Sequence, residues 1–131
     1  MDNKYKNYNY LDVYKKAYIL AVQVHKMSLN LPGYELYEQG SQLRRSSKSI
    51  VANIVEGYGR RRYKGEFVKF LTYAQSSCDE TIVHIKLISD THDLKNKLMD
   101  FVKEYDHLGK MINKYIQFVD SKWDVNMVHE P

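Results

Sequence analysis

Basic side chains crowd one stretch near the middle of the chain. Between Arg44 and Lys69 the sequence holds eight basic residues and two acidic ones, a local net charge of +6, whereas the whole chain carries +4. Guanidinium and ammonium groups gathered on one surface attract polyanions and neutralise phosphates. The stretch therefore predicts a nucleic-acid-binding surface. The predicted contact residues are Arg60, Arg61, Arg62, Lys64, Lys48 and Lys69.

Two tyrosines, Tyr58 and Tyr63, flank the densest part of this cluster. Arginine binds phosphate oxygens through its planar fork of donors, and an aromatic ring offers an unpaired base a surface on which to stack. The cluster thus indicates binding by phosphate neutralisation, with little reading of base edges.

The same charges have a second interpretation, as ordinary ion pairs on solvated helices. Glu56 precedes Arg60 by four residues, and Glu66 lies near Arg62, so some of these arginines would form exposed helix pairs. The sequence leaves both interpretations open for the cluster.

Arg44 and Arg45 stand apart from the dense cluster and call for a different explanation. For these two residues we favour a structural role. Across a helical bundle they would reach acidic residues of the following helix, such as Asp79 or Glu80.

Constellations that support catalysis or metal binding are missing from the sequence. No histidine lies four residues from another, whereas zinc ligands recur at short fixed spacings. Cys78 falls on an apolar helix face between Ala74 and Ile82, which predicts a buried, inert thiol. We therefore expect no enzyme and no cofactor, since a hydrolase or nuclease would need a metal or a carboxylate cluster assembled between helices or subunits. The five histidines are His25, His84, His92, His107 and His129.

Length and composition point to one ordinary globular domain, residues 1–131. A single cysteine offers no internal disulfide, the first residues do not resemble a secretory signal, and no apolar run approaches the ~20 residues of a membrane span. We expect a cytoplasmic protein without membrane contact.

Apolar residues recur every three or four positions in four stretches separated by short breaks. The first apolar face begins at Tyr10, the second stretch is rich in small residues that permit close helix contact, and Asp93 is a plausible N-cap for the last helix. The last stretch keeps its repeat without a miss, which favours coiled-coil-like packing. The pattern predicts an all-α fold, an antiparallel up-down-up-down four-helix bundle with flexible ends, including a mobile tail from Trp123. The predicted helices span about 10–29, 35–58, 65–89 and 94–121.

The central segment also resembles a known family. The order of Gln42–Ile50, Asn53–Arg60, Glu66–Ala74 and Ser76–Glu80 is similar to that of a bacterial, ribosomal-protein-like four-helix-bundle family encoded within intervening sequences of 23S ribosomal RNA genes. Ser46 and Ser47 stand where that family often has alanine. The resemblance implies structural roles for five motif positions, Arg44, Arg45, Asn53, Glu56 and Gly57.

The resemblance further implies self-association, as a homopentamer, and a relation to the accessory protein of diversity-generating retroelements, which works with a reverse transcriptase. From the residues and the resemblance together we expect a non-catalytic oligomeric protein that binds RNA, with ribosomal RNA as one candidate. The alternative is a protein-interaction scaffold that partners a nucleic-acid enzyme such as a reverse transcriptase.

Overall fold

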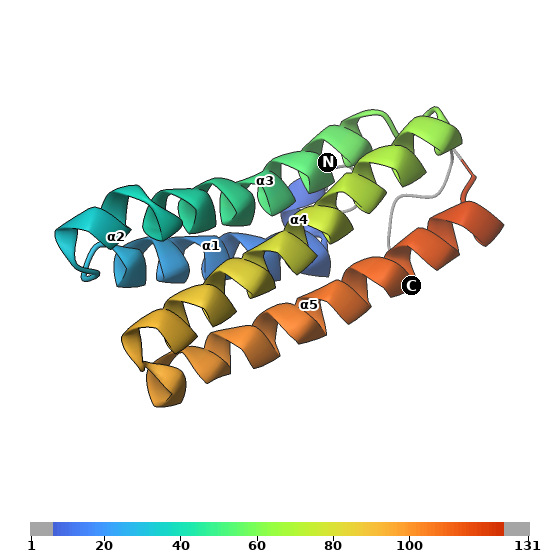
Figure 1. The fold of residues 1–131 in the computed structure, drawn as a ribbon. Helices are drawn as coiled ribbons and strands as arrows, with labels where there is room; N and C mark the ends of the chain where they lie inside the picture. Colours follow the sequence, from blue (N-terminus) through green and yellow to red (C-terminus); the bar gives the residue numbers. More distant parts are fainter. Residues whose placement is uncertain (1–6, 125–131) are drawn as a thin grey trace.

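Helices account for the architecture of the described chain. This computed structural model describes residues 7–124, without the side chains of residues 95–97. Four long helices pack side by side, and the segments that connect them lie at alternating ends of the molecule (Figure 1). The prediction of an all-α four-helix bundle is therefore confirmed, and within the described range no helix has both the length and the hydropathy that crossing a bilayer requires. The elements are η1 (Tyr8–Tyr10), α1 (Asp12–Ser28), α2 (Gly33–Tyr37), α3 (Gln39–Gly59), α4 (Lys64–His92) and α5 (Lys95–Lys122).

The helix predicted over residues 35–58 is in fact two helices, α2 and α3, which meet at Glu38. The backbone of Glu38 has φ −98° and ψ −97°, outside the helical region. Next to this break the Glu35 side chain accepts a hydrogen bond from the Gln39 amide at 3.1 Å. Gly40 also packs so closely on the Glu35 carbonyl oxygen that a Cβ there would lie 2.9 Å from it. A side chain that captures a backbone donor competes with the helical ladder, which periodicity does not reveal.

The boundary between α4 and α5 also differs from the prediction. α4 continues to His92, three residues beyond the expected end, and Asp93 is its C-cap rather than the N-cap of α5. Asp93 has φ 57° and ψ 44°, and the amide of Leu94 donates to the Ser89 carbonyl at 2.9 Å. Aspartate tolerates this left-handed conformation better than most residues, so it ends a helix here in the manner of a glycine.

The two chain ends were expected to be flexible, but residues 1–6 and 125–131 lie outside the described residues. Trp123 is described, and the prediction of a mobile tail is wrong for this first residue, whereas it stays a prediction for residues 125–131. Its ring packs 5.1 Å from that of Phe67, and its Nε1 donates to the Arg61 carbonyl at 3.0 Å. At the other end, Tyr10 precedes α1 and is 49% exposed, so the buried face of α1 begins at Val13 instead.

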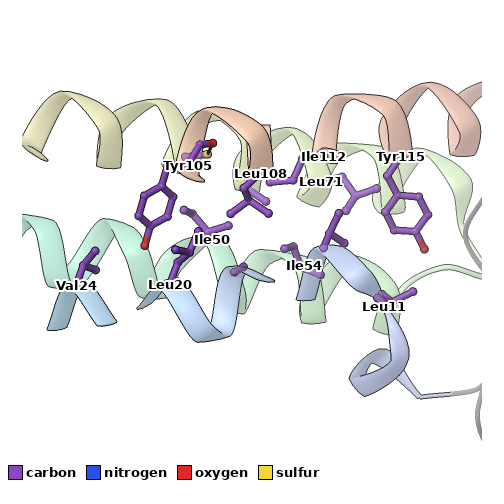
Figure 2. Packing of buried hydrophobic residues seen from close by; sticks show 14 of the residues in the cluster. Leu11, Leu20, Val24, Ile50, Ile54, Leu71, Tyr105, Leu108, Ile112 and Tyr115 are labelled. Atoms are coloured by element: carbon purple, nitrogen blue, oxygen red, sulfur yellow. Dashed lines mark hydrogen bonds between the residues drawn. The ribbon is translucent and has the colours of Figure 1, made fainter. Parts of the chain in front are cut away.

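One continuous apolar core fills the space between the four long helices. Figure 2 shows side chains of α5 facing those of α1 and α3 across this core. The apolar stripe predicted for α5 is confirmed, because its members from Leu98 to Val119 are buried, with Phe101 partly so. Each such leucine or isoleucine stabilises the fold by roughly 1.5–3 kcal/mol, enough for packing to dominate helix stability. The fully buried members on α5 include Leu98, Tyr105, Leu108, Ile112, Tyr115 and Val119.

Small polar residues line the contact between α3 and α4, the most extensive helix pair in the bundle. The hydroxyls of Ser46 and Thr81 lie 2.9 Å apart, and those of Ser49 and Ser77 lie 3.0 Å apart. Asn53 donates from Nδ2 to the Ser49 carbonyl at 2.9 Å. The small side chains let the two backbones approach, and the paired hydroxyls remove the penalty for burying them.

Candidate nucleic-acid interface

The basic cluster occupies the turn between α3 and α4, and we call residues 60–64 the basic turn. α3 ends at Gly59, and the amide of Arg60 donates to the carbonyl oxygens of Glu56 and Gly57. The Tyr63 amide donates to the Arg60 carbonyl at 2.8 Å, and α4 begins at the next residue. Backbone hydrogen bonds therefore hold the turn in one shape at one end of the bundle (Figure 1).

Arg60 is neutralised within the chain. Its guanidinium lies 3.0 Å from Glu66 Oε1 and 3.3 Å from Glu56 Oε1, and its plane covers the ring of Phe70 at 4.8 Å. The predicted pair of Glu56 with Arg60 is confirmed, whereas the proximity predicted for Glu66 and Arg62 does not lead to a pair. Two carboxylates and an aromatic face leave Arg60 little capacity for an external phosphate, so it chiefly positions the turn.

Arg61 is half-buried and is held by Tyr58. Its Nη1 donates to the Tyr58 carbonyl at 2.9 Å, and its guanidinium lies 4.2 Å from the centre of the Tyr58 ring. Tyr58 itself is buried, and this burial raises the pKa of its hydroxyl while the charge of Arg61 lowers it. The prediction that Tyr58 could stack on a base is wrong, because the ring faces the core and Arg61.

Three residues at the tip of the turn remain open to solvent. Arg62 and Lys64 are exposed and form no hydrogen bond or ion pair with any described residue, and Tyr63 between them is 62% exposed. Lys69 lies one turn into α4, where it makes a loose 3.8 Å pair with Glu66. The uncompensated charge of the site is thus concentrated on Arg62 and Lys64.

Lys48 does not belong to this site. It lies twelve residues before Arg60 on α3, which corresponds to about 18 Å along the helix axis. The remaining five predicted cations and two carboxylates, Glu56 and Glu66, give residues 56–69 a net charge of +3. The structure therefore brings together five of the six predicted contact residues, and three of these five have internal contacts.

Comparison with known proteins identifies the family. The model of the 23S rRNA-intervening sequence protein family matches residues 9–114, which is most of the chain. The chain belongs to this family. None of the curated proteins and none of the solved structures matches it significantly.

Arg44 and Arg45 are two of the motif positions of the family, and they precede the basic turn on α3. Arg44 donates from Nη1 to Ser28 Oγ and from Nη2 to the Leu36 carbonyl, both at 2.8 Å, so it ties α3 to the ends of α1 and α2. Arg44 therefore makes structural contacts, but its hydrogen-bond partners lie on α1 and α2 and not on α4, where Asp79 and Glu80 were predicted. Arg45 is exposed and forms no hydrogen bond or ion pair with a described residue.

Gly57, another of the motif positions, lies where α3 and α4 converge on the basic turn. A Cβ there would lie 3.2 Å from Phe70 Cβ and 3.3 Å from the Phe67 carbonyl oxygen, closer than ordinary side-chain contacts. The glycine therefore lets the two helices approach at the end that carries the turn. The prediction of close packing from small residues is confirmed here.

Cys78 is buried as predicted, and its Sγ donates to the Tyr105 carbonyl at 3.2 Å. Burial raises the pKa of the thiol to about 12, with smaller contributions from Asp79 and Asp106. Nucleophilic thiols have the opposite setting, exposed and electropositive. Among the described residues no group of three or more histidine, cysteine or acidic side chains could hold a metal ion.

Proposed function

We propose that this member of the 23S rRNA-intervening sequence protein family is a non-catalytic, oligomeric RNA-binding protein, with ribosomal RNA as one candidate target. One observation carries the proposal: Arg62 and Lys64 project from a rigid turn without a carboxylate partner among the described residues. Like charges held this close repel each other unless an anion screens them. The description of the family refers to 23S rRNA, and the phosphate backbone of RNA is such an anion.

The turn supplies the parts of a simple binding mechanism. Arg60 and Arg61 are held by internal contacts that keep the turn in one shape, so the backbone of the turn need not be ordered when RNA binds. Arg62 and Lys64 would neutralise phosphates, and the exposed ring of Tyr63 would stack on an unpaired base. Such contacts favour RNA over uncharged ligands but carry little sequence information.

Self-association would multiply this weak, local attraction. Several turns on one particle raise the effective concentration of the remaining turns once the first is bound. Exposed apolar side chains on α1, Tyr18, Ile19 and Val22, support an oligomer, because contiguous exposed apolar groups mark contact surfaces. The number of subunits is proposed as five on the basis of the family resemblance.

The test compares two double charge reversals by fluorescence anisotropy with a labelled single-stranded RNA. Arg62→Glu with Lys64→Glu should weaken binding at least tenfold at about 100 mM salt and flatten the plot of log affinity against log salt. The matched control reverses two exposed lysines of α5, Lys103→Glu with Lys114→Glu, which makes the same change in net charge.

The control variant should bind within about threefold of the parent, because general attraction alone depends on net charge and is largely screened. Circular dichroism should show unchanged helix content in both variants. Equal losses in the two variants would mean that binding follows net charge rather than the basic turn. If the variant with Arg62→Glu and Lys64→Glu bound RNA as tightly as the parent, the proposed site would be contradicted.

A further inference from the structure

An apolar groove runs between α1 and α3, away from the basic turn. Its volume is about 450 Å³, and its floor and walls are almost entirely carbon. Two of its members, Tyr18 and Val22, are exposed although they are apolar, and Val51 and Ala52 line the α3 side. We call it the α1/α3 groove. Its lining residues are Tyr18, Ala21, Val22, His25, Lys26, Lys48, Val51 and Ala52.

The two formally charged side chains that line this groove, Lys26 and Lys48, are both positive. Residues 13–34 and 39–55, which include nearly all of α1 and α3, contain no aspartate or glutamate. Lys26 lies on the α1 wall and Lys48 on the α3 wall. The pKa of His25 in the groove is lowered, first by burial and then by Lys48 and Arg44. The groove thus suits an apolar segment that also carries carboxylates.

The outer face of α4 combines exposed apolar side chains with carboxylates. Glu80, Val83, Leu87 and Asp90 follow at steps of three, four and three residues, so they form one stripe on the helix. Val83 is 53% exposed and Leu87 is 44% exposed. Asp90 has no partner among the described residues, and Glu80 contacts His84 of its own helix at 3.2 Å. We call these four residues the α4 stripe.

We infer that the α4 stripe of one copy of this chain docks into the α1/α3 groove of the next copy. Val83 and Leu87 would fill the apolar floor, while Glu80 and Asp90 would approach the lysines of the two walls. The lengths match, since the stripe extends about 15 Å along α4 and the groove about 12 Å from Tyr18 to Lys26 along α1. The inference rests on the oligomeric part of the proposed function and assigns the two surfaces that meet.

Charge also argues against the simplest alternative assembly. If two copies met groove to groove, Lys26 and Lys48 of each copy would face the same residues of its partner, and like charges across a contact oppose association. Groove and stripe lie on different helices, so their contact is heterologous: each copy gives one surface and receives the other. Such contacts close into a ring when the rotation between copies allows it. Neither surface includes Arg62 or Lys64, which stay open to RNA.

Two complementary variants test the pairing. Val22→Asp with Ala52→Asp places carboxylates in the groove opposite Glu80 and Asp90. Val83→Lys with Leu87→Lys places cations on the stripe opposite the lysines of the groove. None of the four positions is fully buried, so the fold should persist, which circular dichroism and thermal melting check. By sedimentation velocity at about 100 µM, each variant alone should be a monomer.

Mixing the two variants gives the decisive result. One variant keeps an intact stripe and the other an intact groove, so an equimolar mixture should associate again, at least to dimers. The matched control, Tyr37→Lys with Met99→Lys, changes two exposed apolar residues outside both surfaces and should assemble like the parent. A mixture that stays monomeric, or either variant assembling like the parent, overturns the inference.

The oligomeric state of the unmodified parent protein shows whether a failure concerns this inference alone or also the proposed function. A parent that is monomeric at about 100 µM removes the oligomeric part of the proposed function and the inference with it. A parent that assembles, with variants that assemble equally well, removes only the choice of surfaces. RNA binding by the basic turn, measured on the monomeric variants, is independent of both results.

Discussion

The two ends of the bundle treat their charged residues in opposite ways. At the end that carries α2, Glu35 is only 3% exposed, yet both of its oxygens are used: Oε1 accepts from the Gln39 amide, and Oε2 lies 2.6 Å from His92 Nε2. The turn between α3 and α4 lies at the opposite end (Figure 1). Its Arg62 and Lys64 are exposed without a partner among the described residues.

This difference separates charge that serves the fold from charge that is available for binding. A buried carboxylate is tolerated only when hydrogen bonds replace its water, so the Glu35 side chain cannot change without loss of stability. Exposed cations at a turn contribute little to stability and can be exchanged freely as far as folding is concerned. The comparison predicts that substitutions at the two ends have separable effects on folding and on binding.

The largest expected difference between the two ends is the loss of stability when Glu35 is replaced. Glu35→Ala should lower the free energy of unfolding by about 2–3 kcal/mol, because it leaves the Gln39 amide and the His92 ring without their buried partner. Arg62→Ala with Lys64→Ala should change the same quantity by less than about 0.5 kcal/mol. Urea denaturation measures both, and Glu35→Gln, which keeps an acceptor, should lose less than Glu35→Ala. Equal losses at the two ends would contradict the distinction.

Two glycines near the basic turn provide a second test, of which backbone positions at this end matter for folding. Gly57→Ala should destabilise the protein by about 1–3 kcal/mol, because the new methyl group meets Phe70 and the Phe67 carbonyl. Gly59 has nothing within 4 Å of an added Cβ and a negative φ, so Gly59→Ala should be neutral or stabilising by up to about 1 kcal/mol. Thermal denaturation followed by circular dichroism compares the pair. If both substitutions cost the same, helix convergence does not explain Gly57.

The smallest expected effect concerns the buried thiol of Cys78. Its pKa is about 12 in the folded chain against an ordinary 9.0, so the folded state retains the proton that the unfolded state releases. Stability from this thiol is complete below pH 9 and falls as pH rises, by about 1 kcal/mol between pH 9 and 10. Cys78→Ala should lose less stability over that interval, as urea denaturation at the two pH values would show. Identical losses would mean that the folded thiol ionises normally.

Much of the fold was predictable because packing follows periodicity. The repeat from Leu98 to Val119 predicted one buried face on α5, and those side chains are buried with Phe101 partly so. The position of Cys78 within such a repeat predicted its burial correctly. The break at Glu38 and the left-handed Asp93 were missed, since both depend on individual hydrogen bonds rather than on a repeating pattern.

The candidate site was predictable as a cluster but not residue by residue. The run from Arg60 to Lys64 placed five charged or aromatic residues in one turn, and the i,i+4 spacing of Glu56 and Arg60 predicted their pair. The neutralising role of Glu66 depends on how α4 folds back against α3, which spacing alone does not give. The burial of Tyr58 and the contribution of Trp123 from the far end of the chain were likewise missed.

The sequence by itself determined where apolar and basic side chains are concentrated, because helical periodicity and charge are local properties of the chain. It thereby determined the all-α bundle and the existence of a basic turn. Only the tertiary structure decided which cations are satisfied: contacts between α3, α4 and the end of α5 neutralise Arg60 and hold Arg61. Coulomb attraction and hydrogen bonding act over a few ångströms of space, whatever the separation along the sequence. The open charges of Arg62 and Lys64 therefore become visible only after the chain has folded.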